Sequence, residues 1–294
     1  MIVTRENYYD KETNQEYFSN SQFSDFEKCE AYAMAKIFGY KKKIDGKEET
    51  IYWEDKKVGA MIQGQYVHAW NEGRLDQFKA SNPDLYKEGG TLYAKYADME
   101  NIIDVIKNDK VFMDSLSGEK EKVFTAEWLG VKWKILIDSY MKERKRFSDL
   151  KVLASLDTKE WNNELSIYES VFEYYKYFRQ VSLYAKIEAL SNGRDEEDYY
   201  EPLISVVTKQ KYPDKVIVSF KSDQYGTSKE DIDRTLKEFV EYQLRVVKHK
   251  LPRYKDVKEG REKPIRCEEC DYCRATKKVT GTTLYTRWQL YGGA

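Results

Sequence analysis

The chain has 294 residues, of which 41% are hydrophobic and 34% charged, enough to bury a core in one large domain beneath a polar surface. Its 50 basic and 51 acidic side chains nearly cancel, so a uniformly basic nucleic-acid-binding protein is excluded and any DNA-binding surface must be a local patch. No run approaches the roughly 18 consecutive apolar residues of a membrane helix, and the first residues carry no apolar signal, so we expect a cytoplasmic protein without membrane contact.

The first part of the chain is predicted to be mainly helical. Residues 1–18 are polar, and we expect them to form an extended N-terminal arm. Residues 19–38 carry apolar side chains at helical spacing and predict a helix. Further along, we expect a charged loop over 41–50, a helix over 60–79 that carries His68, and a shorter helix over 99–107.

A change of pattern after residue 120 predicts a sheet. Three extended runs, separated by a Leu-Gly pair and a basic turn, resemble a β-meander and cover 122–128, 131–140 and 147–155. The remaining predicted elements are a helix over 161–190, strands over 204–208 and 216–220, and a long helix over 229–248. Helices that flank a central mixed sheet indicate an α/β or α+β domain. We expect this domain to cover residues 19–250 and to be followed by a polar tail, residues 251–294, which packs on it.

The residues with the clearest chemistry lie on two of the predicted strands. If the basic turn centres between Glu143 and Arg144, antiparallel pairing sets Asp138 directly across from Asp149, with Cβ atoms about 5 Å apart. The two-residue period of a strand puts Lys151 on the same face as Asp149. Two opposed carboxylates repel one another, and a hard divalent cation such as Mg²⁺ would relieve that repulsion and activate water for phosphodiester attack. Lys151 could then orient the water or stabilise the developing charge.

A purely structural role remains an alternative at these positions. Asp138 and Asp149 could simply end their strands, with Lys151 in solvent, because Asp-x-Lys is a common tripeptide. The neighbouring Ile137 and Val152 favour the functional interpretation, since ionised side chains are uncommon in buried strands without a partner.

Four motifs in the chain resemble those of a known family. Asp138, followed eleven positions later by Asp149-Leu150-Lys151, resembles the second and third motifs of PD-(D/E)xK nucleases. Upstream, Gly-Gln-Tyr-Val-His-Ala-Trp-Asn-Glu at 64–72 resembles the histidine motif of the branch that contains RecB-type nucleases and the RecE-type phage exonuclease VIII group.

The segment from Gln180 to Tyr184 resembles the Gln-x-x-x-Tyr motif of the same branch. The motifs occur in the expected order and span roughly residues 19–273. The resemblance implies a restriction-endonuclease-like fold and a deoxyribonuclease that depends on Mg²⁺ or Mn²⁺. It further implies exonuclease action on linear duplex DNA for phage-type recombination, alongside a single-strand annealing protein, by a chain that forms a homo-oligomer.

The same resemblance implies roles for further residues, each with a structural alternative. His68 would be a metal ligand, although a lone helical histidine is often only a hydrogen-bonding residue. The backbone carbonyl of Leu150 would also bind the metal. Gln180 and Tyr184 would bind a phosphate or position the catalytic lysine, unless they belong to a core-facing aromatic stripe. Glu127 is a secondary candidate for a further carboxylate, or a surface residue at a strand end.

The four cysteines predict a second metal centre. Cys267, Cys270 and Cys273 lie within seven residues, a spacing shared by zinc and iron–sulfur sites, and Cys29 on the first predicted helix would complete four thiolates. This arrangement resembles the iron–sulfur staple of AddB-type and CRISPR-associated adaptation nucleases, in which the last gap is usually wider. We expect a 4Fe-4S cluster first, Zn²⁺ second and unligated thiols third. The centre would tie the tail to the first helix.

Two other functions remain open from the sequence. The first is a catalytically inert, nuclease-like module that binds DNA or has a structural role, against which the complete Asp, Asp and Lys set argues. The second is a CRISPR-adaptation or helicase-linked nuclease, although the sequence contains no helicase motif.

Overall fold

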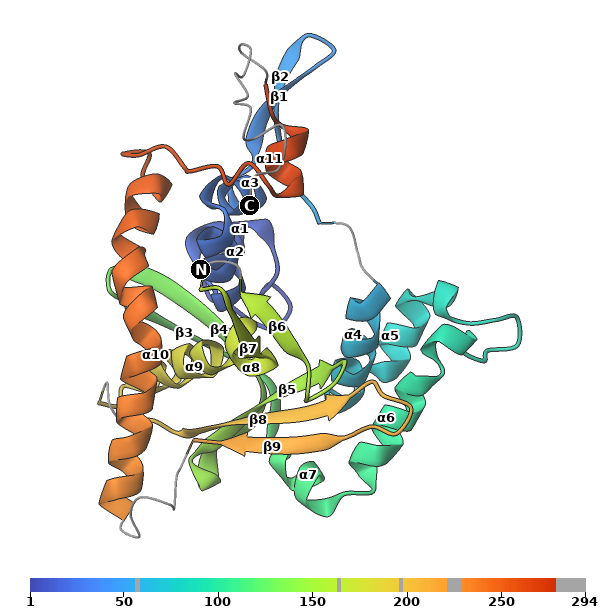
Figure 1. Cartoon of the computed structure of the whole chain (residues 1–294). Coiled ribbons are helices and arrows are strands. Elements are labelled where there is room, and N and C mark those ends of the chain that lie inside the picture. Colours follow the sequence, from blue (N-terminus) through green and yellow to red (C-terminus); the bar gives the residue numbers. More distant parts are fainter. Residues whose placement is uncertain (56–58, 163–164, 196–197, 221–228, 279–294) are drawn as a thin grey trace.

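The computed structural model describes residues 1–55, 59–162, 165–195, 198–220 and 229–278. Its centre is a five-stranded sheet in the order β3-β4-β5-β8-β9 (Figure 1). Only the β5–β8 pair is parallel, so the sheet is mixed, as the sequence predicts. The strands are β3 (Glu119–Trp128), β4 (Val131–Met141), β5 (Arg146–Leu153), β8 (Glu201–Thr208) and β9 (Lys215–Ser219).

The hairpin formed by β4 and β5 follows the predicted register. The ladder between the two strands consists of the pairs Ser139↔Ser148, Tyr140↔Phe147 and Met141↔Arg146. Continued by one step, this register sets Asp138 opposite Asp149. At that point β5 separates from β4, and the N–H of Leu150 donates to the Asp138 carboxylate at 2.7 Å, while β5 pairs along its length with β8.

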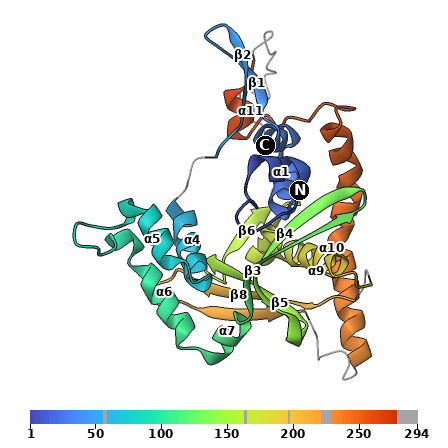
Figure 2. The same ribbon diagram turned by 180° about the vertical axis from the view of Figure 1, so that it is seen from behind.

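Two groups of helices cover the sheet. Helix α9 (Tyr177–Ser191) packs against β3, β4 and β8, and α10 (Lys229–Lys258) packs on α9. Helices α4 (Gly59–Asn71), α6 (Asp98–Lys107) and α7 (Lys110–Ser115) pack against β5 and β8. Figure 2, seen from behind, shows α4 to α7 on the side of the sheet away from α10. Among the described helices, none has the length and apolar composition to cross a bilayer.

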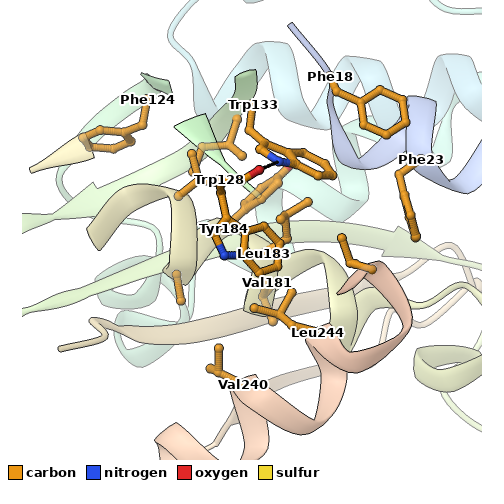
Figure 3. Packing of buried hydrophobic residues seen from close by; sticks show 14 of the residues in the cluster. Phe18, Phe23, Phe124, Trp128, Trp133, Val181, Leu183, Tyr184, Val240 and Leu244 are labelled. Atoms are coloured by element: carbon orange, nitrogen blue, oxygen red, sulfur yellow. Dashed lines mark hydrogen bonds between the residues drawn. The ribbon is translucent and has the colours of Figure 1, made fainter. Parts of the chain in front are cut away.

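The larger apolar core lies around Trp133, which is fully buried. Its indole N–H donates to the carbonyl of Trp128 at 3.2 Å, and its ring packs near Phe18 and Phe23 (Figure 3). Phe18 also exchanges backbone hydrogen bonds with β4, accepting from Lys134 and donating to Lys132. The end of the N-terminal arm is therefore part of the core.

The structure corrects several predicted elements in the first part of the chain. The arm is not extended throughout, because residues 11–16 form α1 (Lys11–Glu16). The helix predicted over 19–38 is two helices, α2 (Asn20–Lys28) and α3 (Glu30–Ile37), separated at Cys29, whose backbone is extended with φ −163°. The helix predicted over 60–79 likewise ends at Asn71, and α5 (Leu75–Ser81) follows a turn through Gly73, where φ is +72°.

Two predicted segments contain hairpins that periodicity missed. The charged loop over 41–50 is the hairpin of β1 (Tyr40–Ile44) and β2 (Lys47–Ile51), closed by Asp45 and Gly46 with positive φ. Its strands carry almost no buried side chain, so they show no apolar alternation. The start of the helix predicted over 161–190 is instead β6 (Lys159–Asn162), β7 (Ile167–Ser170) and α8 (Val171–Tyr174).

The C-terminal part also differs from the prediction. Helix α10 continues ten residues beyond 248, through Pro252, so the helix includes the beginning of the predicted tail. The remaining short elements are α11 (Asp271–Ala275) and the 3₁₀ turns Pro83–Leu85, Ala94–Tyr96 and Lys142–Arg144. Residues 279–294 of the predicted tail lie outside the described part of the chain.

Candidate active site

A cavity of about 820 Å³ brings most of the predicted site residues together. It lies between the sheet, helices α4, α5 and α9, and the N-terminal arm. Six of the predicted residues line it: Asp138, Asp149, Lys151, His68, Gln180 and Tyr184. Three segments that are far apart in the sequence therefore contribute to one site.

His68 and Asp138 form the first contact of this site. His68 Nδ1 lies 3.5 Å from Asp138 Oδ1, and the other oxygen of Asp138 accepts the Leu150 N–H. Burial disfavours the charged imidazole, but the Asp138 and Asp149 carboxylates outweigh it and hold the pKa of His68 above its usual value. Burial would likewise raise the pKa of Asp138, whereas His68, the Lys151 charge and the Leu150 N–H together hold it below its usual value.

Asp149 has the opposite electrostatic behaviour. Burial and the neighbouring Asp138 charge raise the pKa of Asp149, although Lys151 and His68 act in the other direction. The Lys151 ammonium lies 2.7 Å from Asp149 Oδ2, yet among the described residues no hydrogen-bond donor is aligned with this buried oxygen. The pKa of Asp138 is thus lowered while the Asp138 charge helps to raise that of Asp149, and an additional cation would stabilise both carboxylates.

Gln180 fixes the positions of the groups around it. Its Oε1 accepts from Lys151 Nζ, and its Nε2 donates to Asp149 Oδ1 and to the Tyr184 hydroxyl, each at 3.0 Å. The four-residue spacing puts Gln180 and Tyr184 on one face of α9. Lys151 also lies 4.8 Å from the centre of the Tyr177 ring. The lysine is therefore held from three sides.

These residues fit a divalent metal ion. Two carboxylates and an imidazole are ligands that Mg²⁺ or Mn²⁺ accepts, and Asp149 Oδ2 is a buried oxygen without an aligned donor among the residues described. Leu150 is buried directly beside them, and its carbonyl stays a predicted ligand. The arrangement could bind a cation and a phosphate at the same place.

Glu127 is not brought to this site. It is exposed, pairs with Lys132, and lies six residues from Asp138 along the β3–β4 ladder, about 20 Å away. The carboxylate that faces this region is Glu121, which lines the cavity. The flanking pairs Lys120↔Ser139 and Lys122↔Ile137 set it opposite Asp138, although its φ of +47° interrupts the ladder.

The sequence contains a signal for Glu121. The Leu129-Gly130 turn has positive φ at both residues, as a two-residue hairpin turn of type I′ requires. Counting the register outward from this turn reaches Glu121 opposite Asp138. The carboxylate of Glu121 binds Arg5 of the arm and Arg74, the latter at 2.8 Å.

The four cysteines converge at a second place. Their Sγ atoms all lie within 4.8 Å of one another, with Cys29 and Cys273 3.5 Å apart and Cys267 and Cys273 4.0 Å apart. Figure 1 shows α11, which contains Cys273, beside α3 near the top of the molecule. The extended residue between α2 and α3 is Cys29 itself, so the break in the predicted helix places this thiol against the C-terminal segment.

Backbone N–H groups surround these thiols. The N–H of Cys270 and of Glu269 donate to the sulfur of Cys267, and they outweigh burial to lower its pKa to about 7. Burial raises the pKa of Cys270 to about 12. Four sulfurs at this spacing fit a metal that binds thiolates, because a cation would stabilise all four charges at once.

Comparisons with known proteins agree with the geometry. Residues 19–276 match the model of a family described as a PDDEXK-like domain of unknown function (DUF3799). The chain is also similar to the crystal structure, at 2.19 Å resolution, of a candidate exonuclease from Eubacterium rectale. The two are 33% identical, the alignment covers 100% of each chain, and the TM-score is 0.80. A search of curated proteins finds no match.

Proposed function

From the premise that this chain belongs to the PDDEXK-like family whose model it matches, we propose that it is a metal-dependent deoxyribonuclease that acts at the ends of DNA. The mixed sheet flanked by helices is the α+β, restriction-endonuclease-like fold predicted from the sequence. The observation that carries the proposal is the convergence of Asp138, Asp149, Lys151 and His68 on one cavity.

Each of these residues has a role in the proposed reaction. Asp138, Asp149, His68 and the Leu150 carbonyl would hold Mg²⁺ or Mn²⁺. When bound, such an ion polarises the phosphodiester and makes its bound water more acidic. Lys151, fixed between Asp149 and Gln180, can donate hydrogen bonds to a phosphate oxygen and stabilise the negative charge that develops there.

The proposed function predicts a difference between linear and circular DNA. Purified protein should degrade end-labelled linear duplex with Mg²⁺ or Mn²⁺, and chelation of the metal should stop the reaction. Covalently closed circles should persist under the same conditions, because an exonuclease requires an end. Equal degradation of circles would remove the exonuclease part of the proposal, and intact linear DNA with either metal would contradict the nuclease itself.

Gln180 is a positioning residue in this proposal, because it acts through Lys151 and Asp149. We expect Gln180→Ala to lower cleavage about 10- to 100-fold, as is typical when a group that orients a ligand is lost. Gln180→Glu should not restore it, since a carboxylate cannot donate to Asp149 and Tyr184. Titration with Mg²⁺ should show that the variant needs a higher Mg²⁺ concentration for half-maximal cleavage and also reaches a lower maximal rate. An unchanged metal titration would contradict the positioning role.

The biological setting is proposed from the resemblance to exonuclease VIII. It comprises processing of duplex ends for phage-type recombination, a single-strand annealing protein as partner, and a homo-oligomer. The candidate exonuclease from Eubacterium rectale supports the activity but not this setting.

We further propose that Cys29, Cys267, Cys270 and Cys273 hold one metal centre that ties residues 267–273 to the start of α3. Zn–S bonds of about 2.3 Å in a tetrahedron separate the sulfurs by about 3.8 Å. The separations of 3.5 and 4.0 Å support a single tetrahedral ion such as Zn²⁺. In a 4Fe-4S cluster each thiolate binds a different iron, which holds the sulfurs further apart.

A further inference from the structure

The N-terminal arm is fixed to the strand that carries Asp138. The buried ammonium of Lys134, on β4, donates to the Tyr8 carbonyl and to Asn14 Oδ1, the latter at 2.7 Å. The ring of Tyr8 is buried and lies over this ammonium, and the end of the arm is held by Phe18, which is buried in the core. The arm is therefore packed firmly on the sheet where it lines the cavity.

Tyr9 stands out in the arm because it is not buried. Its side chain is 65% exposed, although the adjacent Tyr8 is buried, and both line the cavity with Asp138 and Asp149. The Tyr8 and Tyr9 rings meet edge to face at 5.0 Å, which orients Tyr9. The Arg5 guanidinium lies 5.6 Å from the Tyr9 ring centre. An oriented, exposed aromatic ring beside a cation thus borders the site of the proposed chemistry.

This pair matches the chemistry of a single nucleotide. An exposed aromatic ring stacks on a base of any sequence, and a guanidinium binds phosphate through several N–H donors. Arg5 is held by Glu121 and also lies 4.0 Å from the Glu72 carboxylate, but a guanidinium has five donors, and these carboxylates engage only part of them. Bases inside a duplex are already stacked on both faces, and a base in the terminal pair is kept in line with the helix by its pairing, so an unpaired base is the one free to turn a face onto Tyr9.

We propose that Tyr9 and Arg5 form a subsite for the unpaired terminal nucleotide of a DNA strand, with the base on Tyr9 and its phosphate on Arg5. This inference rests on the proposed nuclease function and names its preferred substrate, which is a frayed or single-stranded end. The fixed position of the arm relative to β4 sets the distance from this nucleotide to Asp138.

The subsite is tested by binding of fluorescent hairpin duplexes that differ only at their open end, with Ca²⁺ replacing Mg²⁺ to slow cleavage. Three kinds of open end are compared. The first is blunt, the second has an unpaired overhang on one strand or the other, and the third has the same overhangs with abasic nucleotides. Wild-type protein should bind one overhang about tenfold more tightly than the blunt end, and removal of the base should abolish the difference. Tyr9→Ala should bind all ends alike, whereas Tyr9→Phe should keep the preference.

Tyr212→Ala is the matched control. Tyr212 is 82% exposed in the connection between β8 and β9, and it is not among the described residues that line the cavity. This variant should bind as the wild type does. If Tyr9→Ala keeps the preference, or if overhangs without bases bind as tightly as complete ones, the subsite is wrong. If the wild-type protein cleaves DNA and Tyr9→Ala has the same preference for ends as the wild type, the subsite alone is overturned. If the wild-type protein cleaves no DNA, the proposed function is overturned.

Discussion

Replacing Asp149 should abolish metal-dependent cleavage of linear DNA. Asp149→Asn keeps the shape of the side chain but removes a charged ligand, and several kcal/mol of transition-state stabilisation correspond to a loss of roughly three orders of magnitude in rate. Asp138→Ala and Lys151→Ala should act in the same direction, because each removes a group that would bind the metal or the phosphate in the proposed reaction. The measurement is the rate of release of labelled nucleotides under saturating Mg²⁺.

The same substitution should not unfold the protein. The folded structure raises the pKa of Asp149 through burial and the Asp138 charge, so the ionised carboxylate destabilises the metal-free fold at neutral pH. A neutral asparagine removes that repulsion. Thermal unfolding without metal should therefore give a midpoint for Asp149→Asn equal to or above that of the wild type.

Glu127→Gln provides the matched control for this experiment. It removes an exposed carboxylate near the turn of the same sheet's β3–β4 hairpin and should leave cleavage unchanged. Full activity in folded Asp149→Asn would contradict the assigned site. A loss in Glu127→Gln equal to that of Asp149→Asn would show that the site is placed wrongly along the strands.

Replacing Cys29 should lower the thermal stability of the protein more than any other proposed substitution. If Cys29 shares a metal with Cys267, the centre closes a loop of more than 230 residues, and opening it should cost about 3 kcal/mol or more. For a chain of this size that corresponds to a fall of roughly 5 °C in the unfolding midpoint of Cys29→Ala. Cleavage should persist at low temperature, because the cavity residues lie on other elements. A chelator strong enough to strip the centre should lower the wild-type midpoint toward that of the variant and leave the variant unchanged.

Metal analysis decides what the cysteines hold. The sulfur spacing leads us to expect one zinc per chain and a colourless protein. Iron with broad visible absorbance in anaerobically prepared protein would overturn the single-ion proposal and identify an iron–sulfur cluster that ties the same residues. Neither metal, together with an unchanged midpoint in Cys29→Ala, would contradict the metal centre.

The hairpin that carries Asp138 and Asp149 can be predicted from the sequence because its contacts are local. Once the turn is taken to centre between Glu143 and Arg144, every pair that follows is determined, Asp138 opposite Asp149 included, and the ladder of the structure has this register. The same counting from the Leu129-Gly130 turn selects Glu121 in place of Glu127. Glu127 is the wrong candidate because proximity along the chain does not measure proximity across the ladder.

Other expectations fail where local periodicity carries little information. The β1–β2 hairpin is exposed on both faces and has no apolar alternation, so its sequence predicts a loop. Apolar spacing persists through Cys29 and predicts one continuous helix over 19–38, although the backbone there is extended. The break allows Cys29 to contact Cys267 and Cys273, and helical periodicity contains no information on such a distant contact.

By itself the sequence determined the strands that carry Asp138 and Asp149, their register once the turn is placed, and the motif residues, because these depend on residues that are close together in the chain. The resemblance implied that His68 and Gln180 belong to this site, but only the tertiary structure decided how they meet the hairpin and that the arm residue Tyr9 lies there too. Those contacts depend on how α4, α9 and the arm pack against the sheet, which is set by burial of their apolar faces over the whole core. Periodicity along one segment specifies which face is apolar, but not which partner covers it.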